Sequence, residues 1–217
     1  MSEELPDAKS LLARAAGGNA TAWGDLLTFH QERLTRIVKF RMDPRLRGRV
    51  DAADVVQEAF IAATTRQEEF FGQSSQPLFL WLRWMVGNKL LELHRHHLGA
   101  QMRDARREVS SDRCSNGYDS HATRTALVEQ LTAGATGPAT AAGRAEQHAR
   151  LNEALEKMDE TDREVLALRH YEQLTSAETA QVLGIQERAA AKRYTRALER
   201  LREILADMPG GLTELRT

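Results

Sequence analysis

Residues 175–196 have the sequence TSAETAQVLGIQERAAAKRYTR, and this stretch decides the fold. Its first four residues match a capping box, in which the Thr175 hydroxyl and the Glu178 carboxylate satisfy backbone N–H groups at the start of a helix. Gly184 suits the left-handed conformation that commonly ends a helix. The helix that follows places an apolar stripe on one face: Ala190, Tyr194, Ala197, Leu201 and Ile204. The stretch therefore predicts a helix-turn-helix.

The second helix of this pair carries a basic outer face. Its cations are Arg188, Lys192, Arg193 and Arg196, and the small residue Ala180 lies where the two helices should approach closely. Cations on an exposed helix that follows a tight turn are typical of DNA recognition in the major groove. A generic helical hairpin with a solvated face is the alternative, but it seldom combines the capping box, the glycine and the cations.

The rest of the chain is predicted to be helical. Apolar residues recur at helical spacing from Trp23, after a cap at Asn19 or Thr21, and Pro44 ends that helix. Further helices are expected over about 52–68, 77–97 and 149–158, and one more begins with Asp162 as its cap. No alternating strand pattern appears. The fold class is therefore all-α.

Composition divides the chain into two helical domains, over 19–98 and 149–205. Between them, residues 99–148 are rich in Ser, Thr, Gly and Ala and hold few large apolar side chains, apart from a short helix near 126–131. We predict that 99–148 is a long flexible linker.

The helix over 52–68 carries a polar stripe. Asp54, Gln57, Glu58 and Ile61 share one side, and the opposite side is apolar. An acidic, hydrogen-bonding stripe with an apolar end suits docking on a basic helical partner. A merely solubilising face is the alternative.

The helix over 77–97 interleaves aromatic and cationic residues. Rings of this kind stack on unpaired bases, while cations follow the phosphates of the backbone. Trp84 lies off the apolar stripe and is expected to be exposed, whereas Trp81 could equally belong to the core.

Overall composition restricts the class of protein. The chain has 217 residues, of which 41% are hydrophobic and 28% charged, and its net charge is −1. Basic blocks over 33–49, 83–107 and 186–203 nevertheless alternate with an acidic block over 51–69, which suggests one anionic and one cationic partner. No apolar run is long enough for membrane insertion, and the acidic N-terminus has no signal-peptide pattern. We expect a cytoplasmic protein.

An enzyme is a weaker alternative. The cluster His94, His96 and His97 could suggest a metal patch, with His121 and His148 elsewhere, but no carboxylate stands at ligand spacing. The single Cys114 cannot form an internal disulfide and is expected to be an ordinary thiol rather than a redox sensor. We find no nucleophile–base pair and no phosphate-binding loop, so we expect no catalytic residue, no metal and no cofactor.

Several of these residues together resemble a known family. The matching segments, in order, are Asp54-Val55-Val56-Gln57-Glu58-Ala59-Phe60, Trp81-Leu82, Asn88, Glu178-Thr179-Ala180, Gly184 and Arg196-Ala197-Leu198. They are similar to the bacterial sigma-70 family, and the two-module size resembles its extracytoplasmic-function subfamily. The resemblance covers about 130 residues in the right order.

The resemblance implies a role for each module. In the region 2-like domain, the residues that would bind the clamp helices of the largest subunit of core RNA polymerase are Asp54, Gln57, Glu58 and Phe60. The loop over 70–77 and the helix after it would recognise and melt the −10 element, through Phe71, Arg83, Trp84, Asn88 and Lys89. In the region 4-like domain, the −35 element would be recognised by Gln186, Glu187, Arg188, Lys192, Arg193 and Arg196.

The implied function is that of a sigma factor, which binds core RNA polymerase and directs transcription initiation at promoter DNA. The alternative is a stand-alone helix-turn-helix regulator, which explains 149–205 but not the acidic heptapeptide. Family analogy alone suggests an anti-sigma factor as a further partner.

Overall fold

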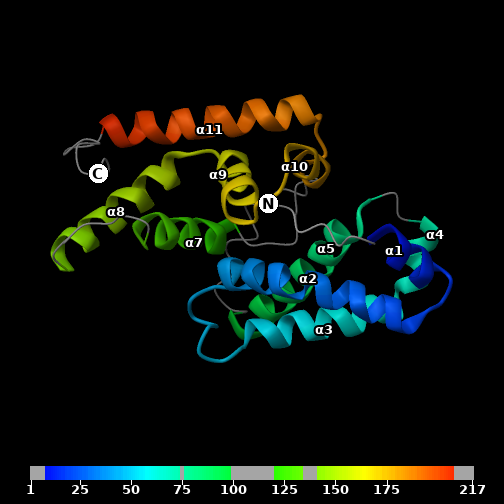
Figure 1. Ribbon diagram of the computed structural model, residues 1–217. Coiled ribbons are helices and arrows are strands. Elements are labelled where there is room, and N and C mark those ends of the chain that lie inside the picture. The colour runs from blue at the N-terminus through cyan, green and yellow to red at the C-terminus, as the bar shows by residue number, and fades with distance from the viewer. Residues whose placement is uncertain (1–7, 74–75, 99–119, 134–140, 208–217) are drawn as a thin grey trace.

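The computed structural model describes residues 8–73, 76–98, 120–133 and 141–207 (Figure 1). The N-terminal module consists of α1 (Ala8–Ala16), α2 (Ala20–Arg41), α3 (Ala52–Thr65), α4 (Gln67–Gln73) and α5 (Leu78–Leu98). The C-terminal module consists of α7 (Ser120–Ala133), α8 (Ala141–Lys157), α9 (Glu160–Leu166), the π-helical segment η1 (Ala167–Tyr171), α10 (Ser176–Leu183) and α11 (Glu187–Asp207). These residues contain no strand, and the all-α prediction is confirmed.

Side chains that precede the helices fix where several of them begin. Asn19 accepts a hydrogen bond from the backbone N–H of Ala22 at 2.9 Å and starts α2, in agreement with one of the two predicted caps. The cap of α9 is Asp159, whose carboxylate accepts from the N–H of Thr161 at 2.8 Å. The predicted cap, Asp162, is wrong, because the helix has already begun at Glu160.

The helix-turn-helix forms as the sequence predicts. The Thr175 hydroxyl accepts from the N–H of Glu178 at 3.1 Å, and the Glu178 carboxylate accepts from the N–H of Thr175 at 2.7 Å, which completes the capping box. Gly184 ends α10 with φ 64°, in the left-handed region where glycine meets no Cβ penalty. Three residues later α11 begins at Glu187, so local chemistry alone sets the turn.

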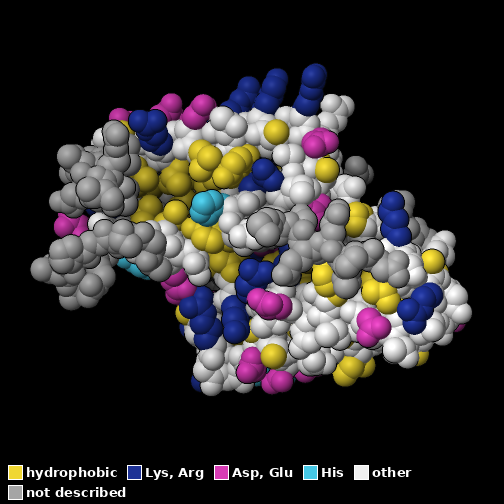
Figure 2. Space-filling model, in the orientation of Figure 1, with side chains coloured by type: hydrophobic (Ala, Val, Ile, Leu, Met, Phe, Trp, Pro, Cys, Tyr) yellow, Lys and Arg dark blue, Asp and Glu magenta, His cyan; other side chains and the backbone are white. Residues whose placement is uncertain are grey.

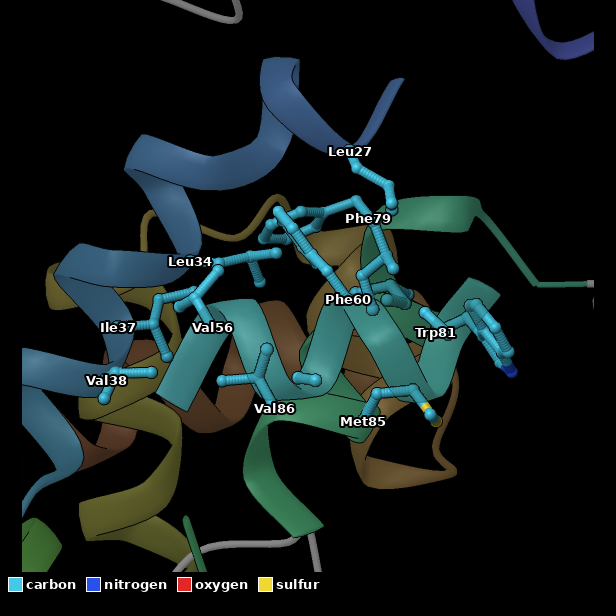
Figure 3. Close-up of a cluster of buried hydrophobic side chains, with 14 of the residues drawn as sticks. Leu27, Leu34, Ile37, Val38, Val56, Phe60, Phe79, Trp81, Met85 and Val86 are labelled. Carbon is cyan, nitrogen blue, oxygen red and sulfur yellow. The ribbon is translucent and has the colours of Figure 1, made fainter. Parts of the chain in front are cut away.

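The core of the N-terminal module lies between α2, α3 and α5. Figure 3 shows Leu34 and Val38 of α2 gathered with Val56 of α3 and Val86 of α5, and all four are fully buried. Burial of each such side chain contributes roughly 1.5–3 kcal/mol. This packing orients α3 and α5 so that their remaining faces stay at the surface.

The C-terminal module has a second core, which corrects the linker prediction. Leu127 of α7 and Leu155 of α8 are fully buried together with Ala197 of α11. Residues 120–133 and 141–148, expected to be flexible, are helical, and Ala126, Leu127 and Val128 of the first segment are buried in this core. None of the described helices combines the length and apolar character that a membrane span requires.

The two modules pack against each other. Val165, Leu168, Leu174 and Leu183 of the C-terminal module are buried in the same hydrophobic cluster as the core of the N-terminal module. The rings of Phe40 and Tyr171 stack across the boundary with centroids 4.8 Å apart, and Figure 1 shows α7 and α9 lying over α2. The picture of two modules on a free tether does not describe this structure.

The first prediction concerns Gly184. Gly184→Ala places a Cβ in open space but leaves φ positive, so we expect the free energy of unfolding to fall by roughly 1–2 kcal/mol. Urea unfolding of wild type and variant measures this free energy. The matched control is Gly48→Ala, which is equally unobstructed and has no positive φ, and its stability should change by less than about 0.5 kcal/mol. Equal losses of stability in Gly184→Ala and Gly48→Ala would contradict a conformational cost at Gly184.

The second prediction concerns His30 of α2, whose ring lies 5.5 Å from that of Phe79. Burial, followed by the charge of Arg33, lowers the pKa of His30 from 6.5 to about 4, although Glu178 opposes this. Between pH 6.5 and 4, His30 is therefore protonated in the unfolded chain but neutral in the folded chain. The free energy of unfolding consequently decreases as the pH falls from 6.5 towards 4.

His30→Gln should consequently reduce the slope of the unfolding free energy against pH over this range, as measured by urea titrations at several pH values. His97→Gln, at an exposed position of α5, is the control and should keep the wild-type slope. A wild-type slope in His30→Gln would refute the assignment.

Candidate protein and nucleic-acid interfaces

One side of α3 forms an acidic surface, which we define as Asp54, Gln57, Glu58 and Ile61. All four side chains are exposed, and Ile61 has 67% of its surface accessible, an unusual value for a large apolar side chain. The opposite side of α3 is buried through Val55, Val56, Ala59, Phe60 and Ala63. The acidic surface thus combines carboxylates, an amide and one apolar anchor on a rigid helix.

Phe60 does not belong to this surface. Its side chain is 7% exposed and packs in the core of the N-terminal module, so the prediction that it contacts a partner is corrected. The period of the helix explains this, because Phe60 follows Val56 by four residues and shares its inward direction. Phe60 packs in the core on the opposite side of α3 and so helps to hold this helix in place.

Glu58 links the acidic surface to α5. Its carboxylate lies 2.7 Å from the Nζ atom of Lys89, which also pairs with Glu92 at 3.2 Å. The hydrogen bond that Lys89 donates to Glu58 is the main cause of the raised pKa of Lys89. Both partners stay accessible, so these acids are not packed inward.

The outer side of α5 carries Trp84. Its side chain is 39% exposed, and the Arg66 guanidinium lies 5.5 Å from the ring centroid, whereas Trp81 is only 5% exposed and belongs to the core. The expectation that Trp84 is the exposed tryptophan is confirmed. Asn88 and Lys89, one turn further along, are half-buried.

Phe71 lies in a helix rather than in the expected loop. Residues 67–73 form α4, and the Phe71 ring meets that of Trp23 edge-on, with centroids 5.8 Å apart. Aromatic packing with Trp23 and Phe70 extends helical order into the segment, so the predicted loop over 70–77 is corrected. The Phe71 side chain remains half-buried.

Arg83 differs most from its predicted role. We expected it to contact DNA, yet its side chain is 3% exposed, and its Nε donates a hydrogen bond to Oε2 of Glu172 at 2.5 Å. Its residue neighbour Trp84 points outward, because consecutive helical residues diverge by about 100°. In this conformation Arg83 is withdrawn from any external ligand.

The recognition helix α11 presents its polar residues to solvent. Gln186, Glu187, Arg188, Lys192 and Arg196 are exposed and Arg193 is half-buried, while Ala190, Ala197 and Leu201 hold the helix against the module. Figure 2 shows Lys and Arg side chains standing out along α11. All six side chains predicted for the −35 element thus lie on one helix or at its start.

Comparisons with known proteins show which proteins this chain is similar to. Residues 148–201 match the family described as Sigma-70, region 4. The RNA polymerase sigma factor CnrH of Cupriavidus metallidurans is 27% identical over 195 residues, which cover 90% of this chain and 92% of CnrH. Residues 148–201 thus match region 4 of the sigma-70 factors, and the chain as a whole is similar to sigma factors of the extracytoplasmic-function group.

A second relative and a solved structure of CnrH are also similar to this chain. The ECF RNA polymerase sigma factor SigD of Mycobacterium tuberculosis is 26% identical over 194 residues, or 89% of this chain and 82% of SigD. The solved structure of CnrH in complex with the cytosolic domain of CnrY covers 93% of this chain and 99% of that chain, with 25% identity and a TM-score of 0.49. The sequence alignments span both modules of the sigma factor.

Sequence analysis missed an ion cluster between the modules, which we define as Arg41, Arg83, Glu164 and Glu172. Arg41 contacts Glu172 at 2.6 Å and Glu164 at 2.7 Å, and the side chains of Arg41 and Glu172 are completely buried. These residues are up to 131 positions apart, and no local pattern marks them as partners.

The histidines that could suggest a metal patch do not form one group, although the rings of His96 and His97 lie 4.8 Å apart. His94 is buried and accepts a hydrogen bond from the N–H of Asp43 at 3.3 Å, whereas His96 and His97 are exposed. Within the described part of the sigma factor, no three His, Cys, Asp or Glu side chains form a group that could hold a metal ion. Cys114 lies outside the described residues.

Proposed function

We propose that this sigma factor binds core RNA polymerase through the acidic surface of α3 and then directs promoter-specific transcription initiation in the cytoplasm. One observation carries the proposal: a rigid helix exposes Asp54, Gln57 and Glu58 together with Ile61 on the same molecule as an exposed helix-turn-helix. A basic helical partner would have complementary charge, and the family resemblance implies that this partner is the clamp helices of the largest polymerase subunit. Complementary potentials of this kind set register and association rate.

The −10 element is proposed to engage α5. Trp84 offers an exposed ring for stacking on an unpaired base, and Lys89 and Asn88 lie one turn away to meet the backbone or a base edge. Flipping a base costs a few kcal/mol, and stacking at roughly 1–3 kcal/mol per base offsets that cost. Phe71 is half-buried in α4 and would contribute to recognition of the −10 element from that helix.

The −35 element is proposed to receive the N-terminal half of α11 in its major groove. Gln186, Glu187, Arg188 and Lys192 would meet base edges, while Arg193 and Arg196 would meet phosphates. The same residues stand in the first turns of α11, which is the part of a recognition helix that enters the groove.

A regulatory protein is proposed as a further partner. CnrH, a relative in sequence, has been solved in complex with the cytosolic domain of CnrY. By family analogy this sigma factor would bind an anti-sigma factor. No catalytic chemistry is proposed for the chain, since a sigma factor acts by binding.

The stand-alone regulator is the weaker function. The sigma-factor relatives align over about nine-tenths of this chain, including the N-terminal module that such a regulator does not need. The test is run-off transcription with purified core polymerase, with and without the chain, followed by mapping of the start sites. Transcripts that start at the same sites without the chain would refute the proposal.

The third prediction tests the acidic surface. Asp54→Lys should weaken binding to core polymerase by about tenfold or more, because it brings a cation towards a basic partner. Fluorescence anisotropy of the labelled chain against core polymerase measures the change. Glu153→Lys on α8 makes the same charge change at an exposed site outside the surface and should bind as wild type does. If Asp54→Lys binds equally well, α3 is not the docking surface.

The fourth prediction tests α11. Lys192→Ala should lower promoter-dependent run-off by about 5- to 50-fold, as expected for the loss of one base or phosphate contact. Arg202→Ala removes an equally exposed cation ten residues further along the helix and should change run-off less than about twofold. Equal losses in the two variants would indicate general electrostatic attraction instead of a docked N-terminal half.

A further inference from the structure

A pocket opens beside the C-terminal end of α2. Its walls come from α2, from residues 47–52, from α7 and from η1, and its volume is about 820 Å³. Figure 2 shows Lys and Arg side chains grouped at this end of α2. Pockets of this size hold small-molecule ligands in other proteins. None of the residues proposed above for polymerase or promoter DNA lines it.

Four cationic side chains line the pocket, and two carboxylates oppose them. The cations are Arg36, Lys39, Arg47 and Arg49. The carboxylates are already engaged: Asp51 accepts a hydrogen bond from the N–H of Ala53 at 2.8 Å and so caps α3. Glu129 of α7 pairs with Arg47 at 2.7 Å. The pocket therefore carries an excess of positive charge.

Three of these cations are available to a ligand. Among the residues that the structure describes, Arg36, Lys39 and Arg49 form no ion pair with a carboxylate, and all three are exposed. Arg36 and Lys39 stand three positions apart on α2, a spacing that places them side by side on the helix, where like charges repel. An anion bound between these side chains would replace repulsion with attraction.

An aromatic pair forms another part of the pocket wall. The rings of Phe40 and Tyr171 both line it and are stacked, with an angle of 18° between their planes. Burial raises the pKa of Tyr171 to about 12, so its phenol stays neutral and does not repel an anion. A wall of this kind beside cations suits a ligand that joins anionic groups to a flat ring.

We propose that this pocket binds a small ligand with a chain of two or three phosphate groups, either free or carried by a nucleoside. Guanidinium and ammonium groups hold phosphate oxygens through charge-assisted hydrogen bonds. A single phosphate group carries at most about two negative charges at neutral pH, fewer than the three available cations. The sequence has no glycine-rich loop that could cradle phosphates with backbone N–H groups, so side chains would hold them here.

The inference goes beyond the proposed function and does not depend on it, because the site needs neither polymerase nor promoter DNA. Its test is isothermal titration calorimetry of the full chain with ATP, tripolyphosphate and AMP. At least one of ATP and tripolyphosphate should bind, and AMP should bind about tenfold more weakly or worse. If neither binds, or if AMP binds as tightly, the inference is overturned.

The same titrations distinguish the two sources of the phosphate chain. Tighter binding of ATP than of tripolyphosphate would assign a nucleotide, whose base would use the wall of Phe40 and Tyr171. Equal or tighter binding of tripolyphosphate would assign the free phosphate chain. Either result supports the polyphosphate site.

Variants locate the binding in the pocket. Arg36→Ala and Lys39→Ala should each weaken binding of the tighter ligand by about tenfold, as expected for the loss of one charge-assisted contact. Both positions are exposed, so the variants should unfold at the wild-type temperature. Arg202→Ala removes an exposed cation of α11 and should change the affinity less than about twofold. Equal losses in all three variants would indicate unspecific attraction and would overturn the site.

A single-stranded nucleic acid is the competing occupant. If Arg36→Ala weakens binding of a short single-stranded DNA while wild type binds neither ATP nor tripolyphosphate, the cations serve a nucleic-acid backbone and the inference fails. Such a failure would leave run-off transcription by wild type unchanged, because run-off tests the surfaces of α3, α5 and α11. The two proposals are therefore tested separately.

Discussion

The Glu172 carboxylate lies inside the protein between the guanidinium groups of Arg41 and Arg83, which come from two different helices of the N-terminal module. A buried anion in this position is stable only while both cations remain. The requirement ties α2 and α5 to the end of η1 and so fixes how the modules face each other. The apolar side chains that join them, such as Leu168 and Leu174, add attraction, but it is the charges that demand one particular arrangement.

The residues proposed to contact a partner lie outside this junction, and Arg83 is the exception among those expected to contact DNA. Asp54 and Glu58 remain exposed on α3, Trp84 on α5, and the basic side of α11 remains open. Only Arg83 is taken out of contact with solvent. The packing of the two modules therefore leaves the residues proposed for polymerase docking exposed on α3, while Arg83 of α5 is buried.

Local chemistry was predictable from the sequence, and long-range pairing was not. The capping box at Thr175, the turn at Gly184 and the exposure of Trp84 follow from spacing within one or two helices, and the structure has all three. Arg83 was misassigned because burial by a carboxylate 89 residues away leaves no mark in its own helix. The segment over 120–133 was taken for linker because Ala126, Leu127 and Val128 become part of a core only together with residues of α8, α9 and α11.

The π-helical segment η1 widens one turn between Leu166 and Glu172. One additional residue in a helical turn rotates everything after it by roughly 100° relative to a regular α-helix. The direction of the Glu172 side chain thus depends on the number of residues in the η1 turn. A homologue with one residue fewer in this turn would keep the glutamate in its sequence yet aim it elsewhere, so a gap at this position of an alignment marks chains in which this carboxylate does not meet the two arginines.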